Sequence, residues 1–221
     1  MSGQKSPFTP LDDIRRHGAR LVKKFALETQ RKDEARFLKS WLDKPLMTGA
    51  VSPSGKALAK MMARYVDPQT PGPVVELGPG TGPVTEALIA RGVDEKRLIL
   101  VEFNPDFCRL LRKRFPRATV IEGDAYALEM TLADLDEPVA AIVSSLPLFT
   151  RPERQRRALL DAGFRMMRAG SPFIQFTYAA VSPIPLKGKN AGRRDFDAKV
   201  SPRVWLNLPP ACVWVYRKNQ G

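Results

Sequence analysis

The chain has 221 residues, 43% of them hydrophobic, which suits one globular domain with a buried core. Lys and Arg number 36 against 23 Asp and Glu, and the formal net charge of +13 favours polyanionic partners, either nucleic acid or an anionic membrane surface. No apolar run approaches the roughly 20 residues of a membrane-spanning helix, and the first residues lack a secretory signal. One histidine and two cysteines argue against a metal site and Ser-His-Asp chemistry, and predict a reduced, cytoplasmic compartment.

The first 43 residues predict a helical extension before the main domain. A basic amphipathic pattern over 11–25 is typical of a helix that lies in a membrane interface, so we expect residues 1–43 to associate with an anionic membrane surface. The alternative is a helix that packs on the domain with its charges in water, which we prefer for the apolar patch at 37–42. The pattern places on one stripe Leu11, Ile14, Gly18, Leu21, Val22 and Phe25, and opposite it Arg16, Arg20, Lys23 and Lys24.

Residues 44–221 predict a single α/β domain. A loop over 45–54 and a helix over about 55–66 come first, and then short apolar runs alternate with helical patterns. Such alternation is typical of a parallel sheet with crossover helices. We expect strands at 74–77, 98–102, 119–121, 139–144 and 173–178, and helices from about 83, from about 104, near 126–132 and over 153–168.

The C-terminal part of the chain has a different pattern. Residues 204–208 and 212–216 predict two antiparallel strands around a Pro-Pro pair. Residues 181–203, rich in Pro, Gly, Lys and Arg, predict a long loop, and loops of that length in compact domains are usually functional or disordered.

The strongest motif is Val74-Val-Glu-Leu-Gly-Pro-Gly-Thr-Gly82, a strand that ends in an acidic residue and enters a glycine-rich turn. Dinucleotides, phosphates and S-adenosylmethionine all bind at such turns, because glycine lets the backbone approach a ligand closely. The Gly-x-Gly-x-Gly spacing and the acid at the strand end favour S-adenosylmethionine, which carries positive charge. We therefore expect cofactor contacts from Glu76, Gly78, Gly80, Thr81 and Gly82.

An acidic residue also ends the second strand, and another follows the third. Glu102 lies about 20 residues past the glycine loop, where a carboxylate can chelate ribose hydroxyls, and Phe103 and Asn104 are expected beside it. After the third strand comes Gly123-Asp124-Ala125, where Asp124 can accept a hydrogen bond from the adenine amino group. The alternative is that Glu102 and Asp124 only end strands or cap helices.

A polar turn, Ser144-Ser-Leu-Pro147, follows the fourth strand. We expect Ser144 and Leu146 on the cofactor side, and Ser145 and Pro147 beside the reacting nucleophile as catalytic residues. An acid after strands one and two, Gly-Asp after strand three and this turn together resemble the class I S-adenosylmethionine-dependent methyltransferases over about residues 48–217. The resemblance implies a Rossmann-like, seven-stranded, mostly parallel sheet whose last hairpin is antiparallel.

The turn resembles that of methyltransferases acting on exocyclic base nitrogens, which have Asn or Asp, Pro or Leu, Pro and an aromatic residue. Here a serine, Ser145, replaces the amide, Leu148 occupies the aromatic position, and Phe149 comes one place late. An amine acceptor fits through the backbone carbonyls of the turn, whereas stacking on a flipped base is disfavoured.

Longer runs resemble bacterial phospholipid N-methyltransferases of the rhizobial type, which are similar to ribosomal RNA adenine dimethylases. These runs are Phe37–Trp41, Lys44–Gly55, Val75–Val84 and Ser144–Phe149. The resemblance implies a peripheral enzyme on the inner face of the cytoplasmic membrane. There it would methylate phosphatidylethanolamine through mono- and dimethyl forms to phosphatidylcholine, releasing S-adenosylhomocysteine. It also implies that the amino-acid end of the cofactor is closed over by Thr48, Gly49 and Ser52.

For the acceptor side, we expect Tyr178, at the end of the fifth strand, to border the amine as a catalytic residue. An aromatic face tolerates a growing alkylammonium by cation–π attraction, although a core tyrosine is the alternative. The lipid phosphate is expected to bind basic residues of the long loop, with a solvated loop as the alternative. These residues are Lys187, Lys189, Arg193 and Arg194.

Two other functions compete with this interpretation. An RNA adenine methyltransferase is favoured by the charge of +13, but Ser145, Leu148 and the expected lack of an RNA-binding domain after residue 217 oppose it. A non-catalytic membrane- or nucleic-acid-binding module with a retained cofactor fold is opposed by the intact acidic and glycine positions. No general base can be named from the sequence.

Overall fold

The computed structural model describes residues 53–186 and 195–219. The predicted extension over 1–43 lies outside these residues. Within the described part of the chain, no helix is long and apolar enough to cross a bilayer. The helices are α2 (Pro53–Ala63), α3 (Pro83–Arg91), α4 (Pro105–Arg114), α5 (Leu128–Thr131) and α6 (Glu153–Met166).

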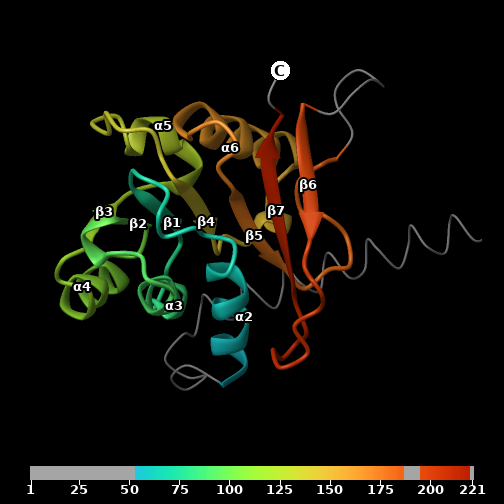
Figure 1. The fold of residues 1–221 in the computed structure, drawn as a ribbon, viewed down its shortest axis with the longest axis horizontal. Coiled ribbons are helices and arrows are strands. Elements are labelled where there is room, and N and C mark those ends of the chain that lie inside the picture. The colour runs from blue at the N-terminus through green and yellow to red at the C-terminus, as the bar shows by residue number, and fades with distance from the viewer. Residues whose placement is uncertain (1–52, 187–194, 220–221) are drawn as a thin grey trace, which may run out of the picture.

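The helices flank one seven-stranded sheet in the order β3-β2-β1-β4-β5-β7-β6 (Figure 1). All neighbours from β3 to β5 are parallel, and β7 is antiparallel to both β5 and β6. This confirms the predicted Rossmann-like class. The strands are β1 (Val74–Leu77), β2 (Leu98–Glu102), β3 (Thr119–Glu122), β4 (Ala141–Ser144), β5 (Phe173–Thr177), β6 (Phe196–Val200) and β7 (Cys212–Lys218).

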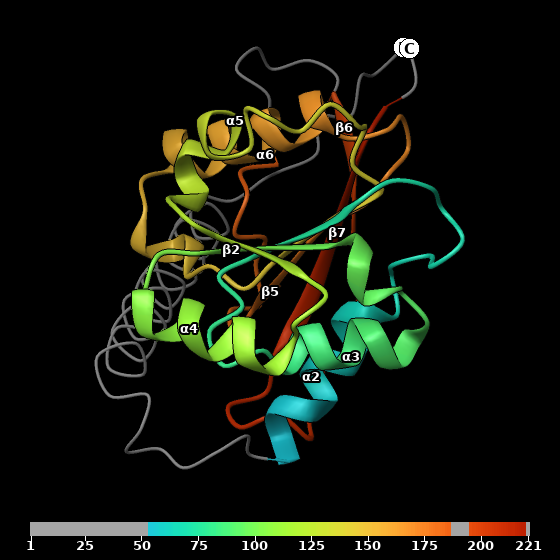
Figure 2. The same cartoon turned by 90° about the vertical axis from the view of Figure 1, so that its left-hand side faces the viewer.

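Two helical layers bury the two faces of the sheet (Figure 2). Helices α2, α3 and α4 cover one face, where Val74 and Leu100 belong to the core, and α5 and α6 cover the other, where Val75 and Ile142 do. Because helices cover both faces of the sheet, all four residues of β1 are buried, and all but Glu76 are apolar. This double burial explains why the sequence predicted the central strands closely.

The chain reverses its direction of winding between β1 and β4. Both strands are parallel neighbours, with Leu77 opposite Ser144, while β2 lies on the other side of β1 with Leu77 opposite Val101. In open α/β sheets, ligands bind outside the carboxyl ends of the strands at such a switch point. The residues that follow β1, β2, β3 and β4 therefore converge on one edge, which we call the carboxyl edge.

The predicted first strand of the terminal hairpin is wrong. Strand β6 occupies Phe196–Val200, inside the expected loop 181–203, whereas within 204–208 only Val204 pairs, in an isolated bridge to Ala211. The reason is that β6 is an edge strand with a solvated face, so polar residues interrupt its apolar pattern. The more apolar run 204–208 forms the connection between β6 and β7 instead.

The burial of Phe196 gives a test of this assignment. Its ring packs on Phe164 and Tyr216, with centroids 6.1 and 5.8 Å away, and is 1% exposed. We expect Phe196→Ala to lower the free energy of unfolding by about 3–5 kcal/mol. Leu208→Ala, at a side chain that is 84% exposed, should change it by less than about 0.5 kcal/mol. Denaturant unfolding followed by circular dichroism measures both, and equal effects would contradict the assignment of β6.

Candidate cofactor and acceptor site

The glycine loop connects β1 to α3 at the carboxyl edge. Gly82, the residue before the helix, has φ of 86°, and a Cβ atom there would lie 2.5 Å from Cε2 of Phe115. Its amide donates to the carbonyl of Pro79 at 2.9 Å, which closes the turn. Position 82 therefore requires glycine for both its backbone conformation and its space.

The Glu102 carboxylate holds the glycine loop against the end of β2. Its Oε2 accepts from the amide of Gly80 at 3.0 Å, its Oε1 accepts from the amide of Asn104 at 2.9 Å, and the residue is 8% exposed. Each carboxylate oxygen has a second lone-pair direction and can accept one more hydrogen bond. The side chain is thus positioned by the fold while it keeps the capacity to chelate a ribose diol.

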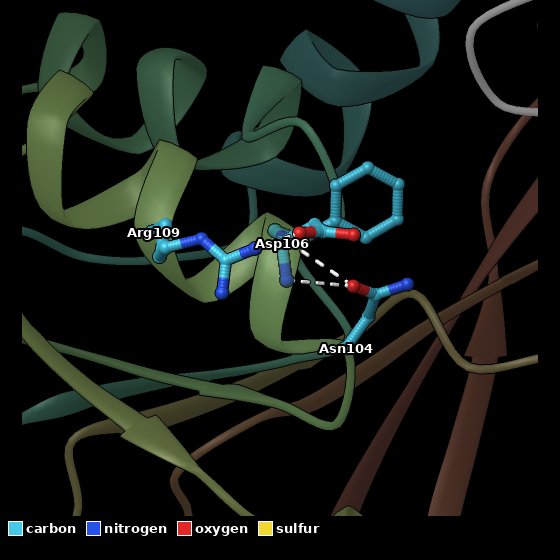
Figure 3. A network of polar contacts seen from close by, with 4 residues as sticks. Asn104, Asp106 and Arg109 are labelled. Carbon is cyan, nitrogen blue, oxygen red and sulfur yellow. Dashed lines mark hydrogen bonds and ion pairs between the residues drawn. The ribbon is translucent and has the colours of Figure 1, made fainter.

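Phe103 and Asn104, which follow Glu102, have different roles in the structure. The Phe103 side chain is 78% exposed, so it offers an aromatic face at the carboxyl edge. The Asn104 side chain caps α4, since its Oδ1 accepts from the amide of Asp106 at 2.8 Å, and Asp106 pairs with Arg109 (Figure 3). A cofactor contact from Asn104 stays a prediction, and capping accounts for its side chain.

Glu76 is the buried acid of the site. It is fully buried, its Oε2 accepts from the Thr85 hydroxyl at 2.7 Å, and its Oε1 has no hydrogen-bond partner. Burial raises the pKa of Glu76 from 4.5 to about 8, and the charge of Glu102 adds to this, whereas the Thr85 hydrogen bond opposes it. An orphaned, buried carboxyl oxygen next to a glycine loop fits a ligand that carries a cationic donor.

The loop after β3 joins the same edge. The amide of Gly123 donates to the carbonyl of Glu102 at 3.0 Å, and a Cβ at Gly123 would lie 2.7 Å from Cγ2 of Thr131. Asp124 is exposed and caps the short helix that begins at Ala125, because its Oδ1 accepts from the amide of Tyr126 at 2.8 Å. One carboxylate oxygen thus holds the loop, and the other, Oδ2, is the one that suits an adenine amino group.

The turn after β4 is fixed by its own hydrogen bonds. The Leu146 carbonyl accepts from the amide of Leu148 at 2.9 Å and from Nε2 of Gln175 at 3.0 Å. The Pro147 carbonyl accepts from the amide and the hydroxyl of Thr150 at 2.9 and 2.7 Å. Both carbonyls are therefore saturated. Among the described residues, no donor reaches the carbonyl or hydroxyl of Ser145, so that residue keeps the acceptors of the turn.

Ser144 ends β4 directly before this turn, and Tyr178 follows the neighbouring strand β5. Ser144 is fully buried, and its Oγ accepts from the amide of Leu146 at 3.4 Å. Tyr178 directly follows β5, so it lies at the carboxyl edge, where its ring packs edge-on against Phe176 at 5.4 Å and its carbonyl accepts from Arg203 at 3.0 Å. Its half-buried position is compatible with both the acceptor role and the core role.

Several predicted site residues fall outside the described part of the chain. They are Thr48, Gly49, Ser52, Lys187, Lys189, Arg193 and Arg194. Conversely, sequence reasoning missed Thr85, which holds Glu76, and Gln175, which holds the turn after β4. Gln175 had a recognisable signal, because it is a polar residue within the apolar strand Phe173–Thr177.

Comparisons with known proteins agree with this geometry. Residues 74–170 match the methyltransferase domain family. An ornithine lipid N-methyltransferase of Singulisphaera acidiphila is 31% identical over 190 residues, which cover 84% of this chain and 96% of that protein. A ribosomal RNA small subunit methyltransferase A of Synechococcus is 40% identical over 98 residues, which cover 43% of this chain and 32% of that protein.

Solved structures show the same fold at low identity. A TehB-like S-adenosylmethionine-dependent methyltransferase of Corynebacterium glutamicum superposes with a TM-score of 0.53 at 16% identity, covering 85% of this chain and 99% of that one. An O-methyltransferase of Bacillus cereus in complex with S-adenosylhomocysteine gives 0.55 at 15% identity, covering 86% and 91%. The chain belongs to the class I S-adenosylmethionine-dependent methyltransferases, and S-adenosylmethionine is its cofactor.

The position of Glu102 predicts a large effect on cofactor affinity. We expect Glu102→Ala to weaken S-adenosylmethionine binding about 100-fold, because two hydrogen bonds to a charged acceptor together contribute about 3 kcal/mol. Isothermal calorimetry measures the affinity, and Glu102→Gln separates loss of charge from loss of the glycine-loop contact. Glu122→Ala is the matched control, since Glu122 ends the neighbouring strand in register with Glu102 and is exposed. Unchanged affinity in both Glu102 variants would remove this residue from the site.

The raised pKa of Glu76 predicts proton release on cofactor binding. Without ligand, a carboxyl with a pKa of about 8 is neutral at about pH 6.5, where the α-ammonium of the cofactor is still charged. That cation favours ionised Glu76, so binding should release close to one proton, and affinity should rise as the pH increases towards 8. Calorimetry in buffers of different ionisation enthalpy measures the release. Glu76→Gln should release none, and release that survives this substitution would contradict the assignment.

Proposed function

We propose that the chain methylates the amine of phosphatidylethanolamine, and then its mono- and dimethyl derivatives, towards phosphatidylcholine. The enzyme would act as a peripheral protein on the inner face of the cytoplasmic membrane. Three features support a lipid amine as the acceptor. These are the 31% identical ornithine lipid N-methyltransferase, the net charge of +13, and the polar-Leu-Pro turn on the same edge as the cofactor residues.

The observation that supports an amine most directly is the hydrogen bonding of the turn. An amine donates hydrogen bonds, and the saturated carbonyls of Leu146 and Pro147 leave Ser145 as the acceptor. S-adenosylmethionine supplies a methyl group on a positively charged sulfur. Ser145 would hold the nitrogen so that its lone pair is aimed at the methyl, and orientation of this kind can lower a barrier by several kcal/mol.

Proton loss from the amine need not involve a strong base. An alkylammonium has a pKa near that of lysine, about 10.4, so a small neutral fraction exists at neutral pH. The Ser145 carbonyl or hydroxyl can stabilise that neutral form by accepting an N–H. The Tyr178 ring, which lies beyond β5 on the same edge, would bind the successive alkylammonium products by cation–π attraction.

The remaining parts of the proposal rest on sequence alone. Basic residues of the loop between β5 and β6 would bind the lipid phosphate, and the amphipathic pattern at 11–25 would bind the anionic surface. A second candidate acceptor is the amine of an ornithine lipid, which is favoured by the name of the 31% identical relative. Ribosomal RNA is a weaker candidate, because the similarity to the RNA methyltransferase covers only 43% of this chain.

Methyl-labelled cofactor tests the acceptor directly. The full chain is offered phosphatidylethanolamine vesicles, ornithine lipid vesicles or ribosomal RNA, and we expect label in phosphatidylethanolamine. Ser145→Ala removes the hydroxyl but keeps the backbone carbonyl, so it should lower the rate at saturating cofactor by about tenfold while it leaves cofactor affinity unchanged.

The outcomes separate the candidates. If only the ornithine lipid is labelled, the lipid-amine chemistry stands and ornithine lipid replaces phosphatidylethanolamine as the substrate. If only RNA is labelled, the proposal is overturned. A chain that binds the cofactor and labels none of the three would support the non-catalytic module. Thr150→Val serves as a control for the turn, because Thr150 contacts the Pro147 carbonyl and not Ser145.

A further inference from the structure

The connection between β6 and β7 exposes three large apolar side chains. Trp205, Leu206 and Leu208 are 74%, 79% and 84% exposed, although the same short segment contains the buried Val204 and Asn207. We call residues 204–211 the apolar loop. Clustered apolar residues of this exposure mark an interaction surface when the chain could have hidden them.

The apolar loop is held in shape by its own hydrogen bonds. Val204 and Ala211 pair at its base, where the Val204 amide donates to the Ala211 carbonyl at 2.7 Å. Asn207 is 4% exposed, its amide donates to the Val204 carbonyl at 3.3 Å, and its Nδ2 donates to the Pro209 carbonyl at 2.7 Å. The polar side chain thus faces inward and the apolar ones face outward, which is the reverse of a loop adapted to water.

The apolar loop lies at the carboxyl edge of the sheet. Cys212, which follows it, is opposite Thr177 at the end of β5, and both Figure 1 and Figure 2 show the loop beside the N-terminal end of α2. Arg203 donates from its guanidinium to the Tyr178 carbonyl at 3.0 Å and to the Pro210 carbonyl at 3.4 Å. The base of the loop is therefore bonded to the residue that we place beside the acceptor.

Cations accompany the apolar side chains. The Arg203 guanidinium lies 5.7 Å from the centroid of the Trp205 ring, and Lys199 is exposed near the end of β6. Tryptophan next to a basic residue is typical of the membrane–water interface, where the ring sits at headgroup level and the cation meets anionic lipid. A net charge of +13 acts in the same direction.

We propose that the apolar loop inserts Trp205, Leu206 and Leu208 into an anionic phospholipid bilayer and so turns the carboxyl edge towards the membrane. This contact is separate from the predicted helix at 11–25, and its link to catalysis rests on the proposed function. A second copy of the chain is a poorer occupant. A stable protein interface typically involves roughly 20–30 residues a side, whereas three exposed side chains on one short loop provide an anchor that a fluid bilayer can surround.

The test uses the full chain with the triple substitution Trp205→Ser, Leu206→Ser and Leu208→Ser. Vesicles contain phosphatidylethanolamine with anionic phosphatidylglycerol, and co-sedimentation measures binding. We expect the affinity for vesicles to fall at least about tenfold, since the variant lacks the three apolar side chains that would be buried in the bilayer. Met130→Ser is the matched control, because Met130 is 77% exposed but lies on α5, on the opposite side of the molecule from the loop in both views.

A second measurement uses the wild-type fold. The emission attributable to Trp205, obtained as the difference between wild type and Trp205→Phe, should shift to shorter wavelength when vesicles are added. Methylation gives a third readout: kcat/KM for vesicle-bound amine lipid should fall about tenfold in the triple variant, while the rate on a short-chain amine lipid dissolved as monomers stays unchanged.

Each outcome decides the proposal. Wild-type affinity of the triple variant together with an unshifted emission would overturn it, and so would a wild-type dimer in sedimentation that the triple substitution abolishes. If wild type binds vesicles through the loop but transfers no methyl group to any lipid, the loop contact holds and the proposed function fails.

Discussion

The Glu102 carboxylate is the contact on which the carboxyl edge depends. One of its oxygens accepts from the glycine loop after β1, the other accepts from the start of α4, and its backbone carbonyl accepts from the loop after β3. A single residue at the end of β2 therefore fixes three segments that are far apart in the sequence. Because it is nearly buried, solvent competes little for these bonds, and the edge is organised before a ligand arrives.

The sequence allowed a close prediction of the part of the fold that is buried on both sides. Strands β1 and β2 have the predicted bounds, since their apolar runs end sharply at Leu77 and Glu102. Strand β6 was missed because an edge strand has a polar, solvated face. The more apolar segment that was taken for a strand is the loop that places Trp205 in solvent. Apolar runs of similar hydrophobicity are therefore buried in the central strands and largely exposed in the segment 204–208.

The site was predictable in its residue types and less so in its hydrogen bonds. Motif spacing indicated that Glu76 and Glu102 lie at the ends of the first two strands and that Asp124 follows the third, and the sheet brings those strand ends together. Which carbonyls of the Ser144–Pro147 turn remain as acceptors depends on Gln175 and Thr150, and this follows only from three-dimensional contacts. The acceptor role of Tyr178 stays a prediction, because a half-buried aromatic side chain at this position also suits a core residue.

The buried carboxyl of Glu76 has a consequence for nucleotide discrimination. ATP shares adenine and ribose with S-adenosylmethionine, so Glu102 and Asp124 alone would select poorly between them. The two molecules differ beyond the ribose, where one has a polyphosphate and the other a cationic amino acid. A polyphosphate has no donor for the unpaired oxygen of Glu76 and would repel its ionised form, so we expect Glu76 to favour S-adenosylmethionine over ATP by charge rather than by shape.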